Sequence, residues 1–517
     1  MHSYKNNKSK YSTFLLIFVA VKVGLNLLAI SHFGFQRDEL LHLALGDHLD
    51  WGFKEVPPFI AVLAKITTAV FGDSVFATRI FSTIFSGLII WFTGQIVIEL
   101  GGKKFAITLA CLALIFSPAF AASGYLFQPV VFDQLWWVLT VYLLVRYINT
   151  SLPVYIYLLG VVIGVGLLTK YTMAFFAVAL ILGLLLTKQR KILWNRHILF
   201  AAIIALIIFL PNIIWQFNHH LPVVTHMKTL RSTQLEYISP SDFIKQQILV
   251  NGIALFVWLI GFGFLLFSPR LRKFQFLAFA FMLIFIFLLW MNGKSYYLFG
   301  AYPMLFAAGA YGFERWTKTR AYALRTVVVF VFTAPNLLLF PMVLPVLSLD
   351  QTLAVFRFAG NSVKFATTWE DHKVHPLTQD YGDMLGWDEM AKKVVKAYNG
   401  LTPEQQKHTQ IYADNYGEAG AIHHFGKKYN LPDVACLNSS FTLWAPDSLN
   451  AHYIIYVDDR GGDNVKKFQS QLDSYTKIGE VEFPNAREKG TGIFLLINSK
   501  PKLDEVYRKE LAEKRLE

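Results

Sequence analysis

Charged residues are scarce in this chain, and acidic residues are almost missing from its first two thirds. Only 16% of the 517 residues are charged, whereas 54% are hydrophobic. Residues 1–350 hold 27 Lys and Arg but only 12 Asp and Glu. A typical soluble domain has about 25% charged residues. The composition therefore excludes an ordinary soluble protein and indicates a chain embedded in a lipid bilayer.

Cysteine is also rare, and the two that occur, Cys111 and Cys436, stand far apart. This excludes a disulfide framework and a cysteine-based metal site. The net charge of +13 does not indicate a nucleic-acid partner, because the surplus lies entirely in residues 1–350. Residues 351–517 hold 21 basic and 23 acidic residues. Basic loops that orient a membrane protein account for this distribution, and no basic patch is left for nucleic acid.

The sequence contains many long apolar runs. A run of about 20 apolar residues crosses a hydrocarbon core, and such runs predict about eleven membrane spans. The first is predicted to stay uncleaved, because Lys22 interrupts its apolar run and no small-residue cleavage site follows. The predicted spans cover 12–31, 76–98, 105–122, 130–148, 152–169, 171–187, 198–216, 247–267, 274–291, 298–314 and 324–347.

The distribution of Lys and Arg predicts how these spans are oriented. With a cytoplasmic N-terminus, the basic residues fall into alternate loops, as the positive-inside rule requires. Residues 32–75 then form a long first outer loop, in which 59–71 has the apolar spacing of an interfacial amphipathic helix. The other outer stretches are 123–129, the joint at Lys170, 217–245 and 292–297. An odd number of spans places residues 351–517 outside as well.

Residues 351–517 differ in character from the rest and predict a small soluble domain. Strand-like runs alternate with helix-like segments, which is typical of an α/β fold. The charged end, 502–517, is predicted to be a solvated helix. The chain is thus divided into a membrane domain, 1–350, and an α/β domain, 351–517. The predicted strands are 410–412, 452–457, 478–483 and 492–497, and the predicted helices are 387–398, 418–428 and 464–474.

Two adjacent carboxylates, Asp38 and Glu39, follow the first span directly. A transferase can use such a pair if one carboxylate takes a proton from an incoming nucleophile while the other orients it. The alternative is that both residues cap a short helix and pair with Arg37, since charges are common at the ends of spans.

The first outer loop continues through Gly46-Asp47-His48-Leu49-Asp50-Trp51-Gly52-Phe53 to Val56-Pro57-Pro58-Phe59. From Arg37 to Arg79 the chain resembles bacterial members of the dolichyl-phosphate-mannose protein mannosyltransferase superfamily, the glycosyltransferase family 39 and 83 type with the C fold. In that family this loop carries an acidic pair, here Asp38 and Glu39, and then two prolines, here Pro57 and Pro58. A His usually precedes the prolines, whereas this chain has Val56.

Two further polar residues occur where the spans meet the outer side. Asp133 matches an acidic position of the family, and a carboxylate costs roughly 2.5–3.5 kcal/mol at the centre of a membrane helix. Asp133 is therefore expected to bind substrate or, alternatively, to accept a hydrogen bond from a neighbouring helix. Lys170 stands against the positive-inside trend, which indicates a negative partner such as a phosphate headgroup. Snorkelling of its side chain to the interface is the alternative.

Two outer stretches complete the resemblance. Lys294, Tyr296 and Tyr297 lie in the last connector, where the family has a basic residue and tyrosines that contact the lipid-linked phosphate. The tyrosines could equally be interfacial belt residues. Trp215, Gln216 and His220 match a Trp-Gln pair and a His of the family, which implies a role in substrate binding. His219 and His220 do not form a metal motif by themselves.

The resemblance implies an inverting transfer of a sugar from a polyprenyl-phosphate donor to a lipid, glycan or protein acceptor, in the periplasmic face of a bacterial inner membrane. Asp38 is expected to act as general base, and Lys294, Lys170 and Arg37 to neutralise the departing phosphate. No cofactor or metal is predicted, although some proteins of this fold use a divalent cation. A lipid or saccharide transporter, a flippase and a non-catalytic assembly factor remain as alternatives.

Overall fold

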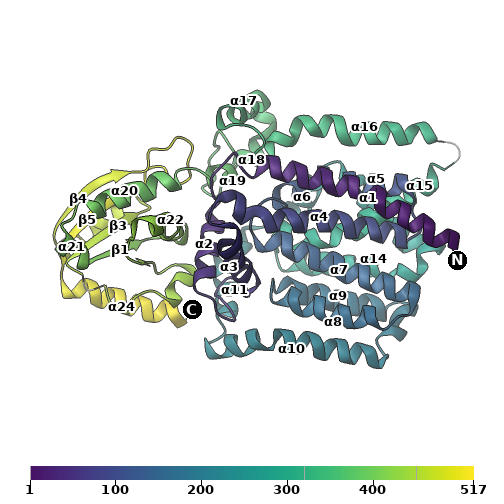
Figure 1. The fold of residues 1–517 in the computed structure, drawn as a ribbon, viewed down its shortest axis with the longest axis horizontal. Helices are drawn as coiled ribbons and strands as arrows, with labels where there is room; N and C mark the ends of the chain where they lie inside the picture. Colours follow the sequence, from purple (N-terminus) through teal and green to yellow (C-terminus); the bar gives the residue numbers. More distant parts are fainter. Residues whose placement is uncertain (1, 319–320, 450, 517) are drawn as a thin grey trace.

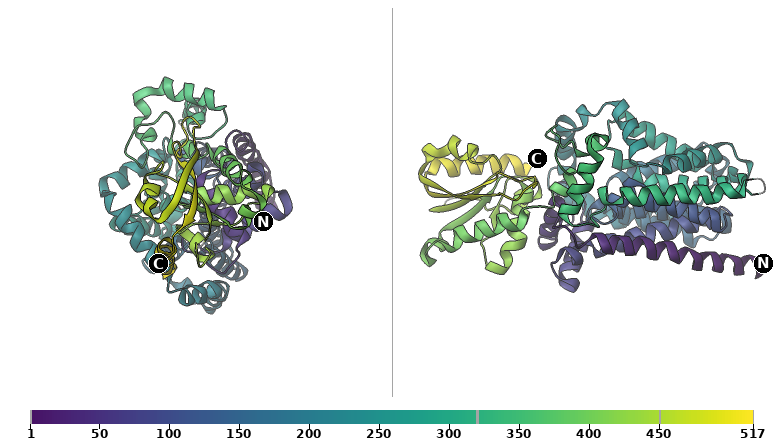
Figure 2. Two further views of the ribbon diagram at one scale, coloured as in Figure 1. Left: turned by 90° about the vertical axis from the view of Figure 1, so that its left-hand side faces the viewer. Right: turned by 90° about the horizontal axis from the view of Figure 1, so that it is seen from above.

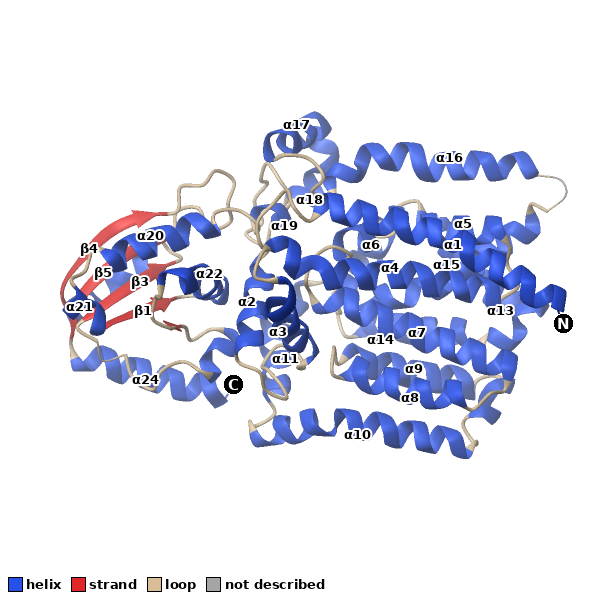
Figure 3. Cartoon of the chain, viewed as in Figure 1, coloured by secondary structure: helices blue, strands red, loops and turns tan. Residues whose placement is uncertain are grey.

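In this computed structural model, the molecule consists of a bundle of long helices and a small sheet. The structure describes residues 2–318, 321–449 and 451–516. The helical bundle fills one end, and the sheet with its own helices fills the other (Figure 1). All the strands belong to the C-terminal part, as the red arrows in Figure 3 show. The predicted fold class, a polytopic helical membrane protein with a C-terminal α/β part, is confirmed.

The apolar runs of the sequence form the helices of the bundle. Among the described residues, five helices are long and apolar enough to cross a membrane, or six if one bent pair counts as a span. Five other apolar helices are shorter, so the predicted count of eleven is not confirmed. The bundle helices are α1 (His2–Ala29), α4 (Val75–Glu99), α5 (Lys104–Phe116), α7 (Pro129–Thr150), α8 (Val154–Leu167), α9 (Thr172–Leu185), α10 (Arg196–Asn218), α13 (Ala254–Phe267), α14 (Phe276–Trp290), α15 (Tyr302–Trp316) and α16 (Tyr322–Leu339).

Two predicted spans are interrupted. The span predicted at 105–122 ends at Ser117, because the backbone there is extended and Pro118 starts the short helix α6 (Pro118–Ser123). The span predicted at 247–267 is bent by 107° between α12 (Pro240–Leu249) and α13. Gly252 lies in this break with φ +53°, a conformation that glycine adopts without strain.

The basic loops gather at the end of the bundle that lies away from the sheet, where the N-terminus also lies (Figure 1). Arg146 pairs with Glu99 at 2.6 Å, and the Lys103 amide donates to the Glu314 carboxylate at 2.7 Å. Lys273 donates to the side-chain oxygen of Asn149 at 2.5 Å. Loops that are far apart in the sequence thus contact each other at this end, and the orientation of the bundle in a membrane stays a prediction.

A layer of shorter helices separates the bundle from the sheet (Figures 1 and 2). Its members are α2 (Arg37–Asp47), α3 (Phe59–Phe71) and α11 (Pro222–Thr233). The helix predicted at 59–71 has these bounds in the structure. The amide of Phe59, the first residue of α3, donates to the Leu168 carbonyl at 3.0 Å and so ties this layer to the bundle.

The C-terminal sheet has five strands in the order β2-β1-β3-β5-β4, with β1 parallel to β2 and β3 and the other pairs antiparallel. Alternate residues face opposite sides of the sheet, so Ile455 and Val457 pack toward the helices α20 and α22, whereas Ile454 and Tyr456 pack toward α24. The strands are β1 (Thr409–Ala413), β2 (Val434–Ala435), β3 (Tyr453–Asp458), β4 (Leu472–Glu480) and β5 (Gly492–Ser499), and the main helices beside them are α20 (Trp387–Asn399), α22 (Tyr416–Gly426), α23 (Asp463–Phe468) and α24 (Pro501–Leu516). Helix α17 (Leu349–Ala359) lies away from the sheet, near the end of α16 (Figure 1).

The sheet part docks onto the layer mainly through α22 and α2. Gly420 lies so close to α2 that a Cβ there would come within 3.0 Å of Leu40. At the edge of this contact the Asp47 carboxylate accepts from the His423 ring at 3.0 Å and pairs with Lys427. A close backbone approach and an ionic cluster therefore hold residues of the C-terminal part against the first outer loop.

Candidate active site

The adjacent carboxylates lie in the first turn of α2 and point in different directions. Gln36 caps the helix and forms a capping box with Glu39. The Glu39 carboxylate is fully buried, where it accepts two N–H bonds from Arg79, at 2.8 and 2.9 Å, and one from the Phe127 amide at 2.8 Å. Its role in catalysis stays a prediction, and its contacts match the capping alternative, with Arg79 in place of Arg37 as the partner.

Replacing Glu39 with Gln is expected to destabilise the fold by about 3–5 kcal/mol, because the Arg79 guanidinium would stay buried without a counter-charge. The effect is measured as the melting temperature of the purified protein, with unfolding monitored by fluorescence-detected size-exclusion chromatography. The control is Asp242→Asn in the exposed Lys245 pair, which should leave the melting temperature unchanged. Equal melting temperatures for Glu39→Gln and the control would contradict the assigned role of the pair.

Asp38 is half-buried and is oriented by two side chains from distant segments. Its Oδ1 accepts from the Tyr416 hydroxyl at 2.8 Å, and its Oδ2 accepts from the Gln128 amide at 3.1 Å. The Arg37 guanidinium lies 4.5 Å from the centre of the Tyr416 ring. The C-terminal part therefore contributes a residue directly to this carboxylate.

Lys170 and Lys294 lie around one aromatic ring. The Lys170 ammonium is 4.6 Å from the Tyr296 ring centre and 5.0 Å from that of Tyr297, and Lys294 is 5.9 Å from the Tyr296 ring centre. No carboxylate within the described ranges forms a salt bridge with either ammonium group. Two neighbouring cations without a direct salt bridge to a described carboxylate form a positive environment suited to a phosphate.

Asp133 is buried on α7 and lies beside Lys170. Its Oδ1 accepts from the Trp137 indole at 3.0 Å, and its Oδ2 accepts from the Thr172 hydroxyl at 2.7 Å. The carboxylate attracts the Lys170 ammonium electrostatically. The hydrogen bond from a neighbouring helix, which was the alternative for this residue, is thus present, and it holds a negative charge behind Lys170.

Electrostatic coupling links Lys294 to Asp38, and Lys170 to Asp133 and Lys294. Burial lowers the pKa of Lys294, and the negative charges of Glu370 and Asp38 oppose this decrease. Asp38 also interacts with the Tyr296 hydroxyl. Asp38, Asp133, Lys170 and Lys294 come from four separate segments, and the structure brings them into one neighbourhood.

The remaining predicted residues lie beside this neighbourhood. The Trp215 indole donates to Asp50 at 2.7 Å, and the Gln216 amide donates to the hydroxyl of Tyr171, the residue after Lys170, at 2.9 Å. The first contact fastens the first outer loop to α10, and the second fastens the joint between α8 and α9 to it. Pro57 and Pro58 are buried directly before α3. His220 is exposed, and no hydrogen bond to another described side chain is found for it.

Several polar residues in the neighbourhood were not predicted from the sequence. Burial and the nearby Asp38 and Glu370 carboxylates together raise the pKa of Asp380 to about 6. Burial lowers the pKa of His226, which lies near Glu55 and Lys294. Neither Asp380 nor His226 stands in a recognisable motif, and no spacing in the sequence reveals the contact between Tyr416 and Asp38.

Three carboxylates of the sheet part could approach a metal ion. Within the described part of the chain, Asp414, Asp458 and Asp459 form the one group of ligand atoms that lie within 4.8 Å of one another. Both oxygens of Asp458 already accept backbone N–H bonds from Arg460, Asn464 and Val465. These hydrogen bonds account for the grouping, and we assign no metal to it. The absence of a metal from the reaction stays a prediction.

Known proteins resemble this chain in family signature and in fold. Residues 55–215 match the family model of dolichyl-phosphate-mannose-protein mannosyltransferase. No curated protein matches at the level of sequence. ArnT from Cupriavidus metallidurans bound to undecaprenyl phosphate has a similar structure, with a TM-score of 0.61 and 12% identity, over 94% of this chain and 98% of that one.

Other solved structures show the same likeness. The apo state of the same ArnT aligns with a TM-score of 0.59 and 15% identity over 94% of this chain and 98% of that one. The oligosaccharyltransferase of Archaeoglobus fulgidus, in complex with Zn and sulfate, aligns with a TM-score of 0.52 and 12% identity over 92% and 73%. The resemblance predicted from the sequence is therefore confirmed: residues 55–215 carry the dolichyl-phosphate-mannose-protein mannosyltransferase signature, and the chain shares its fold with these solved structures.

Proposed function

We propose that this protein transfers a sugar from a polyprenyl-phosphate donor to a hydroxyl group of a lipid, glycan or protein acceptor. The observation that carries the proposal is the pair of lysines, Lys170 and Lys294. They form no salt bridge with a described carboxylate and lie beside one aromatic ring, and Lys294 is near an oriented carboxylate, Asp38. The sugar phosphate would lie with its anionic group on the lysines. Its anomeric carbon would then face Asp38.

The proposed reaction is a single displacement. Asp38 accepts the proton of the acceptor hydroxyl, whose oxygen forms a bond to the anomeric carbon. The bond between that carbon and the phosphate oxygen breaks, and the electron pair leaves with the phosphate. Attack opposite the leaving group inverts the configuration. Lys170, Lys294 and Arg37 stabilise the phosphate dianion, so no covalent enzyme intermediate is needed.

The supporting residues have separate roles in this proposal. Tyr416 and Gln128 each donate one hydrogen bond to Asp38 and so fix its orientation. Tyr296 and Tyr297 hold the Lys170 ammonium against their rings. The negative charge of Asp133 attracts the Lys170 ammonium. Glu39 acts as a positioning residue, because its bonds to Arg79 and Phe127 set the place of α2.

We further propose that the reaction takes place on the periplasmic side of a bacterial inner membrane. The basic loops and the N-terminus lie at the end of the bundle away from the sheet, and basic loops favour the cytoplasm. Residues 351–517 and the neighbourhood of Asp38 would then be periplasmic. A lipid-linked donor suits this side, since the phosphate of such a donor reaches the site from within the membrane.

A transfer assay with purified protein tests the proposed function. The protein is reconstituted in liposomes with radiolabelled polyprenyl-phosphate hexoses and pentoses and with an envelope glycoconjugate fraction as acceptor. Appearance of label in the acceptor and release of free polyprenyl phosphate are expected. A transporter or flippase would instead move intact donor across the bilayer. Movement without cleavage of the sugar phosphate would overturn the proposal.

Asp380 should influence the pH dependence of the reaction. The pKa of Asp380 is raised to about 6 by burial and by Asp38 and Glu370, so Asp380 becomes negative above that pH, beside Asp38. Replacing Asp380 with Asn removes this ionisation, so a transition near pH 6 in the wild-type pH–rate profile should disappear. The control is Asp371→Asn, whose carboxylate bonds to His375. A transition near pH 6 that persists in Asp380→Asn would contradict the assignment.

A further inference from the structure

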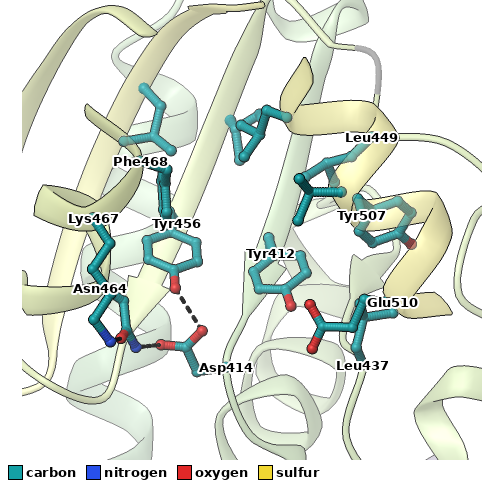
Figure 4. A pocket seen from close by; sticks show the side chains of 14 residues that line it. Tyr412, Asp414, Leu437, Leu449, Tyr456, Asn464, Lys467, Phe468, Tyr507 and Glu510 are labelled. Atoms are coloured by element: carbon teal, nitrogen blue, oxygen red, sulfur yellow. Dashed lines mark hydrogen bonds between the residues drawn. The ribbon is translucent and has the colours of Figure 1, made fainter. Parts of the chain in front are cut away.

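A cavity of about 410 Å³ opens in the C-terminal part, between the sheet and the helices α23 and α24 (Figure 4). Its volume falls in the range of small-molecule sites, roughly 300–1,000 Å³. The walls come from β1, β3, β5 and both helices, so the cavity is set in the folded core of this part and not in a loop. None of its residues belongs to the neighbourhood of Asp38.

One wall of the cavity is aromatic. Tyr412 and Tyr456 are directly paired on β1 and β3, and their rings are stacked with centres 5.4 Å apart and an interplanar angle of 21°. Tyr507 from α24 presents its ring edge to Tyr412 at 6.3 Å. Leu449 and Leu496 add aliphatic surface. The wall therefore offers a flat apolar surface of the size of a six-membered ring.

The polar groups gather at one end of the cavity (Figure 4). Asp414 is held there by the Tyr456 hydroxyl, which donates to its Oδ1 at 2.6 Å, and by the Asn464 amide, which donates to its Oδ2 at 3.0 Å. The Tyr412 hydroxyl and the Glu510 carboxylate also lie at this end (Figure 4), and no described residue forms a hydrogen bond with either. These two groups are free to bond to a ligand.

A saccharide fits this combination better than other small ligands. A pyranose ring has one face of C–H groups, which suits the tyrosine pair, and hydroxyl groups around its edge, which can donate to carboxylates and accept from a phenol. An acyl chain would leave the Tyr412 hydroxyl and Glu510 without partners. Asp414 and Glu510 outnumber the one cation among the lining residues, Lys467, whose ammonium donates to the Asn464 side chain at 2.8 Å, so the cavity disfavours an anion. We propose that this cavity binds a pyranose unit of the acceptor saccharide, an inference that rests on the proposed transferase function.

The chain connects this cavity to the candidate active site. Strand β1 carries Tyr412 and ends at Ala413, directly before Asp414. Two residues after Asp414, Tyr416 donates its hydrogen bond to Asp38. The charge of Arg37 also acts on Asp459, whose amide donates to Asp414 at 3.3 Å. A saccharide chain held in the cavity by one unit would thus be tethered beside the candidate active site. Binding at a distance from the reacting hydroxyl would help to position it.

Saturation-transfer NMR tests the inference on the full-length protein in lipid nanodiscs. The probes are methyl pyranosides of glucose, mannose, galactose and N-acetylglucosamine. Glycoside detergents are avoided because their head groups would compete. At least one pyranoside should bind, and Tyr412→Phe and Glu510→Gln should each weaken its binding about tenfold without lowering the melting temperature. The matched control is Glu505→Gln, an exposed residue of the same helix outside the cavity lining.

Two comparisons separate this inference from the proposed function. Asp38→Asn should keep full pyranoside binding although it loses transfer. Absence of binding for every probe, or equal binding by wild type and both cavity variants, would overturn the inference even if the protein transfers sugar. Cavity-dependent binding in a protein that shows no transfer would leave a saccharide site and overturn the proposed function instead.

Discussion

Replacing Asp38 with Asn is expected to lower the rate of sugar transfer by about 10²–10⁴-fold, the usual contribution of a general base. Asn has nearly the same shape and can still accept the hydrogen bond from Tyr416, but it cannot take the proton of the acceptor hydroxyl. The folded state should therefore persist. Initial rates at saturating donor, together with the melting temperature of the purified variant, measure both parts of the prediction.

The control for this variant is Asp73→Asn. Asp73 is an exposed carboxylate of the same outer loop, between α3 and α4, and its loss should change neither rate nor stability. Wild-type transfer by Asp38→Asn would remove the general-base assignment. An unfolded Asp38→Asn would show instead that the carboxylate is needed for the structure, so a second variant, Asp38→Glu, is measured alongside. Asp38→Glu keeps a carboxylate but displaces it, so this variant should transfer sugar slowly and stay folded.

Replacing Lys294 with Met should reduce transfer by about 10²–10³-fold, the loss expected when one preorganised group that stabilises developing charge is removed. Met has a similar length and no charge. Because the departing phosphate is also the product, the variant should bind free polyprenyl phosphate more weakly as an inhibitor. Donor-dependent rates and product inhibition are the measurements, and Lys245→Met, an exposed residue of α12, is the control.

Lys170 allows a sharper form of the same test. Both ammonium groups lie within 6 Å of the Tyr296 ring centre, so they should bind the same anion. The losses in Lys170→Met and Lys294→Met should then not add in the double variant. Additive losses, or unchanged product inhibition in either single variant, would contradict a shared phosphate site.

Much of the fold could be predicted because it depends on local patterns. The apolar runs at 76–98 and 130–148 became α4 and α7 with little change at their ends, and the spacing at 59–71 marked α3. Strand β4 was less predictable. It begins at Leu472, whereas 464–474 was expected to be helical and the strand to start at 478. Pairing with β5 determines this strand, and such pairing is not visible in a local window.

The candidate site was predictable only in part, since its groups meet through tertiary packing. Asp38, Lys170 and Lys294 stand out in the sequence because charge is costly near a membrane. The inward direction of Glu39 depends on Arg79, forty residues later. The donation from Tyr416 to Asp38 joins residues 378 positions apart. No periodicity encodes such a contact, so the contribution of the C-terminal part could not be foreseen.

The hydrogen bond between Tyr416 and Asp38 has a consequence for biosynthesis. Residues 409–418 must be made, and β1 and α22 must fold, before the phenol can reach the carboxylate. A nascent chain whose helices are already inserted would still have an incompletely oriented base. A reaction that uses Asp38 as its base would thus begin only after the last third of the polypeptide has folded.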